Sequence, residues 1–152
     1  VPPPAVAAAL TRPARESDWP AIAALDARAF GADRTALLRS LAARLPGAAR
    51  VFEEEGGRLR GFVFGRDGRE ACQIGPLLAD DLATAQDLMG DALSALPGPV
   101  LLDLLDRCAA LTPWLRQQGF SFQRPFMRMV HGAPSAPGDN SRIVLVAGPE
   151  LG

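Results

Sequence analysis

Three short runs of strand-forming residues, separated by glycine-containing turns, restrict the fold of this chain more than any other feature. The runs cover residues 50–54, 58–64 and 69–78, and the turns hold Gly56-Gly57 and Gly65 to Gly68. Short strands joined by such turns are typical of an antiparallel meander. A sheet of this kind must bury at least one face, so the flanking sequence has to supply covering helices.

Amphipathic helices are predicted on both sides of the meander. Before it, Ser17 is a candidate N-cap, and apolar residues then follow at spacings of three and four up to Gly31. A second helix is predicted over 34–45 and ends at Pro46-Gly47. After the meander, helices are predicted over 82–96 and 108–118.

Further strands complete the predicted order. They lie at 10–12, at the apolar run 100–102, at 120–130 as one strand in two pieces around Arg124-Pro125, and at 143–146. The order β-α-α-β-β-β-α-β-α-β-β predicts an α/β (α+β) fold, a mixed and mostly antiparallel sheet with helices on both faces. Residues 1–9 resemble a linker, and 10–152 are expected to form one domain, with a polar loop at 132–141.

Charge and composition argue against several classes of partner. The net charge is −1, and the sixteen basic residues, all arginine, are scattered, so neither nucleic acid nor an anionic membrane is an expected partner. No apolar stretch approaches the roughly 18 residues of a membrane span, and no basic leader precedes one. Two cysteines without a secretory signal favour a reducing cytoplasm. The absence of lysine and tyrosine indicates a GC-rich, bacterial genome.

Several short motifs together resemble the GNAT acetyltransferase superfamily, and most closely its YitH-like C-terminal domain. The first runs from Leu25-Asp26 to the stretch Phe30-Gly31-Ala32-Asp33-Arg34. Further on, Gly61-Phe62 leads to Ile74-Gly75-Pro76-Leu77, which is similar to the family's fourth strand. The remaining matches are Leu102-Asp103, Gly119-Phe120, Phe126-Met127-Arg128-Met129 and the ending Gly148-Pro149-Glu150-Leu151-Gly152. Residues 10–152 are expected to be the second half of a tandem GNAT protein.

The resemblance implies transfer of an acetyl group from acetyl-CoA to an amine of a small molecule or peptide. In this fold the pantetheine arm lies where the fourth and fifth strands diverge. That implies contacts with Leu77, Leu78 and Ala79, and Pro76 is consistent with a gap because proline cannot donate to a strand ladder. Ala83 and Thr84 fall where the family's pyrophosphate loop begins the next helix.

Two departures from the family pattern bear on activity. The stretch 80–86 has no glycine and no basic residue, and Asp80 and Asp81 would repel a pyrophosphate; a helix cap is the preferred interpretation of these two carboxylates. Many relatives carry a tyrosine that protonates the leaving thiolate, but Leu115 stands there. Catalysis without a dedicated acid remains possible, since a thiol pKa is near 8.5.

Candidate catalytic groups are few. Asp103 ends the fifth strand and is either a functional carboxylate or a cap of the following turn. Glu70, placed on the fourth strand, could accept an amine proton through water or could simply be solvated. Cys108 stands where many relatives carry asparagine, and a thiol is a poor substitute for an amide. Two cysteines and one histidine do not have metal-ligand spacing, so no metal is expected.

Three functions are compatible with these residues. The first is an active acetyl-CoA-dependent acyltransferase. The second is a catalytically degenerate GNAT module that docks onto, or dimerises with, a catalytic GNAT half placed upstream. The third is a module that binds another small ligand in the same strand gap. A homodimer is compatible with each of the three.

Overall fold

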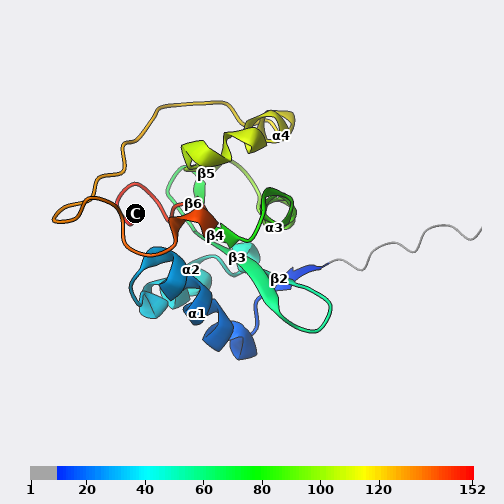
Figure 1. Ribbon diagram of the computed structural model, residues 1–152. Coiled ribbons are helices and arrows are strands. Elements are labelled where there is room, and N and C mark those ends of the chain that lie inside the picture. The colour runs from blue at the N-terminus through cyan, green and yellow to red at the C-terminus, as the bar shows by residue number, and fades with distance from the viewer. Residues whose placement is uncertain (1–9) are drawn as a thin grey trace, which may run out of the picture.

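The computed structural model describes residues 10–152 and contains one mixed sheet with helices on both faces (Figure 1). The strands are β1 (Thr11–Pro13), β2 (Arg50–Glu53), β3 (Leu59–Arg66), β4 (Cys72–Ala79), β5 (Val100–Leu102) and β6 (Ile143–Leu145). The helices are α1 (Trp19–Phe30), α2 (Thr35–Arg44), α3 (Leu82–Ser94) and α4 (Thr112–Gln117). This architecture confirms the predicted fold class. The linker-like residues 1–9 lie outside the described part of the chain.

The sheet begins as the predicted meander. Its order is β1-β2-β3-β4-β5, antiparallel up to β4, with β5 parallel to β4 and β6 antiparallel to β4. Alternate residues of β3 point to opposite faces, as the twofold period of a strand requires. Phe62 and Phe64 pack towards α1 and α2, whereas Val63 packs towards α3 and α4.

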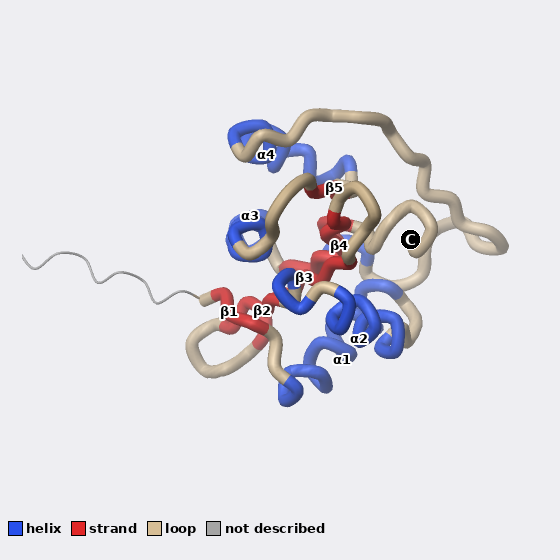
Figure 2. The backbone as a smooth tube through the Cα atoms, turned by 180° about the vertical axis from the view of Figure 1, so that it is seen from behind, coloured by secondary structure: helices blue, strands red, loops and turns tan. Residues whose placement is uncertain are grey.

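Each face of the sheet therefore has its own hydrophobic core. Figures 1 and 2 show α1 and α2 on one side and α3 and α4 on the other. On the α1/α2 side, Trp19 stacks on Phe64 with ring centroids 5.5 Å apart. On the other side, Leu88 and Met89 of α3 and Leu115 of α4 are buried against β4 and β6. No helix in residues 10–152 is both long and apolar enough to cross a membrane.

Three local predictions are wrong. Ser17 does not cap α1, because a 3₁₀ turn (Glu16–Asp18) precedes the helix and Asp18 is the residue at its N-cap. Glu70 is not on the fourth strand, since β4 starts at Cys72 and Glu70 lies in the exposed turn before it. Cys108 does not begin a regular helix; it has φ −100° and ψ 16° within the 3₁₀ segment Asp106–Leu111.

The largest difference concerns residues 120–130, where two strand pieces are predicted. The structure has no strand there. The chain leaves α4 and runs as an arch away from the sheet before it returns to β6 (Figure 1). Strand-forming residues without a neighbouring strand cannot form a ladder, because the backbone hydrogen bonds of a strand come from its partners.

Candidate functional site

The point where β4 ends and α3 begins is the place at which the sequence predicts the cofactor. Asp80 directly follows β4, and Asp81 is the N-cap of α3. One carboxylate oxygen of Asp81 accepts the backbone N–H of Thr84 at 2.7 Å. This contact confirms the predicted helix cap for Asp81 but not for Asp80, whose carboxylate accepts hydrogen bonds from arginines instead.

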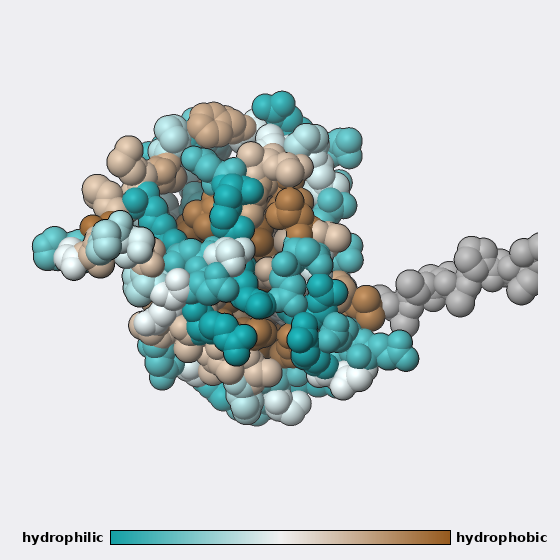
Figure 3. Space-filling view, in the orientation of Figure 1, coloured by the Kyte–Doolittle hydropathy of each residue, from teal (hydrophilic) through white to brown (hydrophobic). Residues whose placement is uncertain are grey.

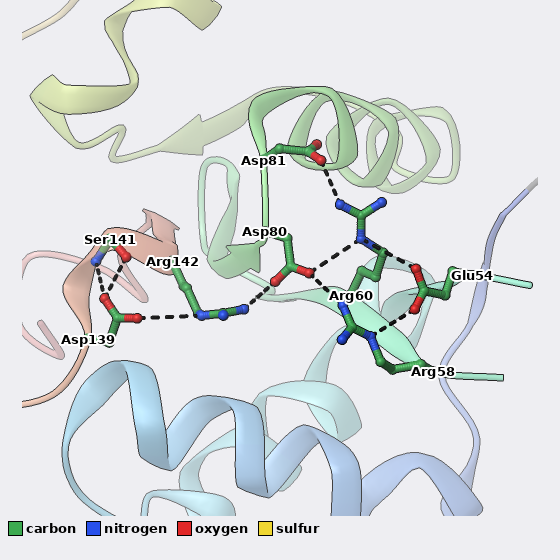
Figure 4. A network of polar contacts seen from close by, with 8 residues as sticks. All are labelled: Glu54, Arg58, Arg60, Asp80, Asp81, Asp139, Ser141 and Arg142. Atoms are coloured by element: carbon green, nitrogen blue, oxygen red, sulfur yellow. Dashed lines mark hydrogen bonds and ion pairs between the residues drawn. The ribbon is translucent and has the colours of Figure 1, made fainter. Parts of the chain in front are cut away.

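Arginines from two other elements meet these carboxylates (Figure 4). Arg60 of β3 donates to Asp81 at 2.7 Å and to Asp80 at 3.3 Å. The antiparallel register, in which Gly61 faces Ala79, brings Arg60 beside Asp80. Arg58 reaches Asp80 at 3.2 Å, and Arg142, just before β6, also donates to Asp80.

The charged side chains of this cluster form ion pairs with one another. Its three arginines, Arg58, Arg60 and Arg142, face four carboxylates, Glu54, Asp80, Asp81 and Asp139. The Thr84 N–H, followed by the Thr84 side chain and Arg60, holds the pKa of Asp81 below its ordinary value. The Asp80 hydrogen bond is the main cause that raises the pKa of Arg60. At neutral pH Asp81 and Arg60 are therefore ionised and paired with each other.

The strand gap predicted beyond Pro76 is not open. β4 and β5 pair only over Cys72–Ile74 and Val100–Leu102 and then part, as predicted. The space between them is filled by β6, where Leu145 lies opposite Leu77 and Ile143 opposite Leu78. On its other side β6 reaches the chain that continues β5, through Leu105 N–H to Val144 O at 3.1 Å and Val146 N–H to Asp103 O at 3.2 Å.

The residues present do not fit a CoA arm in this arrangement. Leu77, Leu78 and Ala79 are buried, and β3 and β6 flank the backbone of Leu77 and Leu78 on both sides. The depression lined by Arg60, Ala79, Asp80 and Arg142 encloses no volume that a water molecule could enter. Ligand pockets for molecules of this size hold several hundred Å³. Thr84 is also buried and already donates to Asp81, while Ala83 is exposed.

The three candidate catalytic residues lie in different surroundings. Asp103 is half-buried just after β5; Gln73 donates to its carboxylate at 3.1 Å, and burial raises its pKa. Cys108 is completely buried, which raises the pKa of its thiol and keeps it in the uncharged form. Glu70 is exposed, about 30 Å along the chain from Ala79 at the usual strand rise.

No hydrogen bond or ion pair in residues 10–152 joins any two of these three residues. Asp103 lies beside β4, since Gln73 of that strand donates to its carboxylate. Their catalytic roles remain predictions. In residues 10–152 no group of three or more His, Cys, Asp or Glu side chains is arranged to hold a metal ion.

Sequence reasoning missed the arginines of the cluster. Arg58 and Arg60 are two residues apart in the predicted strand 58–64, so they are expected to share a face next to the end of the following strand in a meander. That spacing was an available signal. No local sequence pattern indicated Arg142, because it is 62 residues from Asp80 in the sequence.

Comparisons with known proteins assign this chain to a family. The family model described as "Acetyltransferase (GNAT) domain" matches residues 22–145. The comparison with curated proteins gave no match.

Two solved structures share the fold. TTHA1254 from Thermus thermophilus is 20% identical, with a TM-score of 0.58 over 81% of this chain and 98% of that one. A Trypanosoma brucei acetyltransferase is 19% identical, with a TM-score of 0.54 over 79% and 97%. At this identity the likeness concerns the fold alone, whereas the family match covers most of the chain. This chain belongs to the GNAT acetyltransferase domain family, whose general chemistry is acyl transfer.

Proposed function

We propose that the reaction this domain serves is N-acetyl transfer from acetyl-CoA to an amine of a small molecule or peptide. The family match over residues 22–145 carries this proposal. The stretch Phe30-Gly31-Ala32-Asp33-Arg34 and the motif Ile74-Gly75-Pro76-Leu77 support the narrower assignment to the YitH-like branch. For this domain to hold acetyl-CoA itself, β6 must leave Leu77 and Leu78.

A specific observation favours a second candidate function. β6 pairs with Leu77 and Leu78, where the family resemblance implies the cofactor arm, and Asp81 already accepts the Thr84 N–H that a pyrophosphate would need. The second candidate is a degenerate GNAT module that docks beside a catalytic GNAT half. The two candidates differ in one measurable property, the affinity of this domain for acetyl-CoA.

Thermal unfolding with increasing acetyl-CoA separates them. The first candidate predicts stabilisation of about 2.7 kcal/mol at a concentration one hundred times Kd. It also predicts faster amide hydrogen exchange at residues 143–146 in the bound state, because β6 has to detach. Release of free CoA thiol in the presence of amines then measures the transfer reaction.

Arg142→Ala provides a sharper comparison. Arg142 ties the start of β6 to Asp80, so its removal should ease detachment of β6 and increase acetyl-CoA binding under the first candidate. Arg44→Ala is a matched control, since Arg44 pairs with Asp67 on the surface outside the cluster. Absence of binding to both variants and to the unaltered chain would overturn the first candidate.

A further inference from the structure

The carboxylate of Asp103 is half-buried but has no ionic partner in residues 10–152. The other buried or half-buried carboxylates of this part of the chain each have an arginine nitrogen within 3.7 Å: Asp18, Asp26, Glu53, Glu54 and Asp91. Asp103 accepts a single hydrogen bond, from the neutral Gln73 amide to Oδ2. Its Oδ1 accepts none and is not a buried atom, so it can be reached from solvent. A partly desolvated carboxylate without a counter-charge costs stability, and groups of this kind gather at binding sites.

The register of three neighbouring strands fixes the surroundings of this carboxylate. Arg66 of β3 lies opposite Gln73 of β4, and Gln73 lies opposite Leu101 of β5. Side chains at paired positions share a face of the sheet, and Asp103 shares it too because it is two residues beyond Leu101. Gln73 is only 9% exposed, so its side chain is held by its neighbours. The amide therefore holds one carboxylate oxygen of Asp103 and leaves the other free.

The other charges near Asp103 do not neutralise it. Burial is the largest influence and raises the pKa of Asp103, whereas the Gln73 hydrogen bond and the charges of Arg124 and Arg66 lower it. Arg66 already forms an ion pair with Glu150 of the C-terminal turn, and Glu150 itself repels the Asp103 carboxylate. Arg124 acts from a distance, since it donates no hydrogen bond to Asp103 in the described structure. The ionised carboxylate is thus left with an unsatisfied negative charge.

An open hollow with an apolar wall lies on the same face of the sheet. Leu101 is 42% exposed and is one of two exposed leucines in residues 10–152. Together with Arg69, Glu70 and Ala71 it lines a hollow of about 700 Å³, in which the charges of Arg69 and Glu70 offset each other. On the face that Figure 3 shows, strongly hydrophobic residues form only small patches among hydrophilic ones. A ligand with one positive charge and an apolar stem fits Asp103 and Leu101 together.

We propose that Asp103 binds the ammonium group of a small primary amine, that Leu101 contacts the apolar stem of this amine, and that Gln73 positions the carboxylate. Oδ2 accepts the Gln73 amide, and Oδ1 accepts one of the three N–H donors of the ammonium group. Hydrogen bonds between two charged groups are roughly twice as strong as neutral ones. That this amine is the acetyl acceptor rests on the proposed function. The binding itself does not, and it is measured without acetyl-CoA.

Isothermal titration calorimetry at neutral pH compares 2-phenylethylamine with 2-phenylethanol, which has the same stem but no charge. We expect the amine to bind at least about tenfold more tightly than the alcohol. Asp103→Asn keeps the shape of the side chain and removes its charge, so it should weaken amine binding by about tenfold or more. Asp106→Asn is the matched control, because Asp106 is an exposed carboxylate three residues further on, and it should change little. Circular dichroism checks that both variants remain folded.

The pH profile of amine binding tests the role of Gln73. Binding requires the ionised carboxylate, whereas a primary ammonium stays charged below about pH 9, so affinity should fall on acidification. Gln73→Leu removes a hydrogen bond that lowers the pKa of Asp103, so the fall should begin at a higher pH. Arg124→Ala removes a nearby positive charge and should increase the affinity.

Three results would overturn the proposal: no binding of the amine, equal affinities for the amine and the alcohol, or an Asp103→Asn variant that binds the amine as tightly as the unaltered chain. An unchanged pH profile in Gln73→Leu would overturn the positioning role. If acetyl-CoA does not bind but the amine does, the acyltransferase candidate fails and this site stands.

Discussion

Among single residues, Asp26 and Arg34 contribute most clearly to the fold. Their side chains are 2% and 7% exposed and form a two-pronged ion pair with distances of 2.8 and 2.9 Å. Arg34 also lies over the Phe30 ring, 3.9 Å from its centroid. Its second terminal nitrogen, Nη1, is buried without a hydrogen-bond partner in the described structure. The pair ties α1 to the start of α2 through charges that have little access to water.

Asp26→Asn should therefore destabilise the protein strongly. The substitution keeps the shape of the side chain but leaves the Arg34 guanidinium buried without its counter-charge, which costs about 3–5 kcal/mol. Urea unfolding measures the change. Glu16→Gln is the control, because the Glu16–Arg39 pair is largely exposed and its loss should be almost silent. A cost for Asp26→Asn as small as that of the control would contradict this role.

At the scale of elements, Gly61 determines how closely β3, β4 and α3 approach. A Cβ at this position would lie 2.5 Å from the backbone oxygen of Leu78 and 3.0 Å from a methyl group of Leu88. The first distance is to main chain, which can give way only if the strands separate. The absence of a side chain at Gly61 is what allows this β3–β4 register beneath α3.

Gly61→Ala should lower the free energy of unfolding by about 1–3 kcal/mol through overpacking. Gly90→Ala is a matched control, since Gly90 lies within α3 and the nearest atom to its added Cβ is 3.8 Å away. Alanine is favoured over glycine inside a helix by about 1 kcal/mol, so the control should be stabilised. Chemical denaturation of the two variants should give shifts of opposite sign.

For the whole molecule, the carboxylates determine how stability depends on pH. The pKa values of six of them are lowered, in each case chiefly by a hydrogen bond that the carboxylate accepts: Glu16, Asp18, Asp33, Asp81, Asp139 and Glu150. A lowered folded-state pKa contributes stability that is complete above the unfolded pKa. That stability is lost as the pH falls through the folded pKa.

The urea midpoint should thus be nearly constant between about pH 5.5 and 7.5 and fall steadily below about pH 4. The contribution of Asp103 to stability has the opposite sign, because burial raises its pKa and disfavours its charged form. Asp103→Asn should then stabilise the protein at pH 7 and have little effect at pH 3. A midpoint that rises on acidification would show that the carboxylates are not held ionised by the fold.

Much of the architecture could be predicted from local patterns. The spacing of apolar residues located α1, α2 and α3, and glycine turns located the meander, since both depend on periods that repeat within ten residues. The position of Asp81 before an apolar run correctly predicts a helix cap. Glu70 was misplaced because the turn that precedes β4 is longer than its glycine signal suggests.

The amino-acid sequence by itself determined the fold class, the family, the positions of most elements and the lack of a glycine loop after β4. Only the tertiary structure decided that β6 lies between β4 and β5, that Arg142 reaches Asp80, and that residues 120–130 form no strand. The physical reason is the distance along the sequence between the residues that interact. Helices and turns are set by neighbouring residues, whereas the partner of a strand is chosen from the whole chain by which edges remain unpaired.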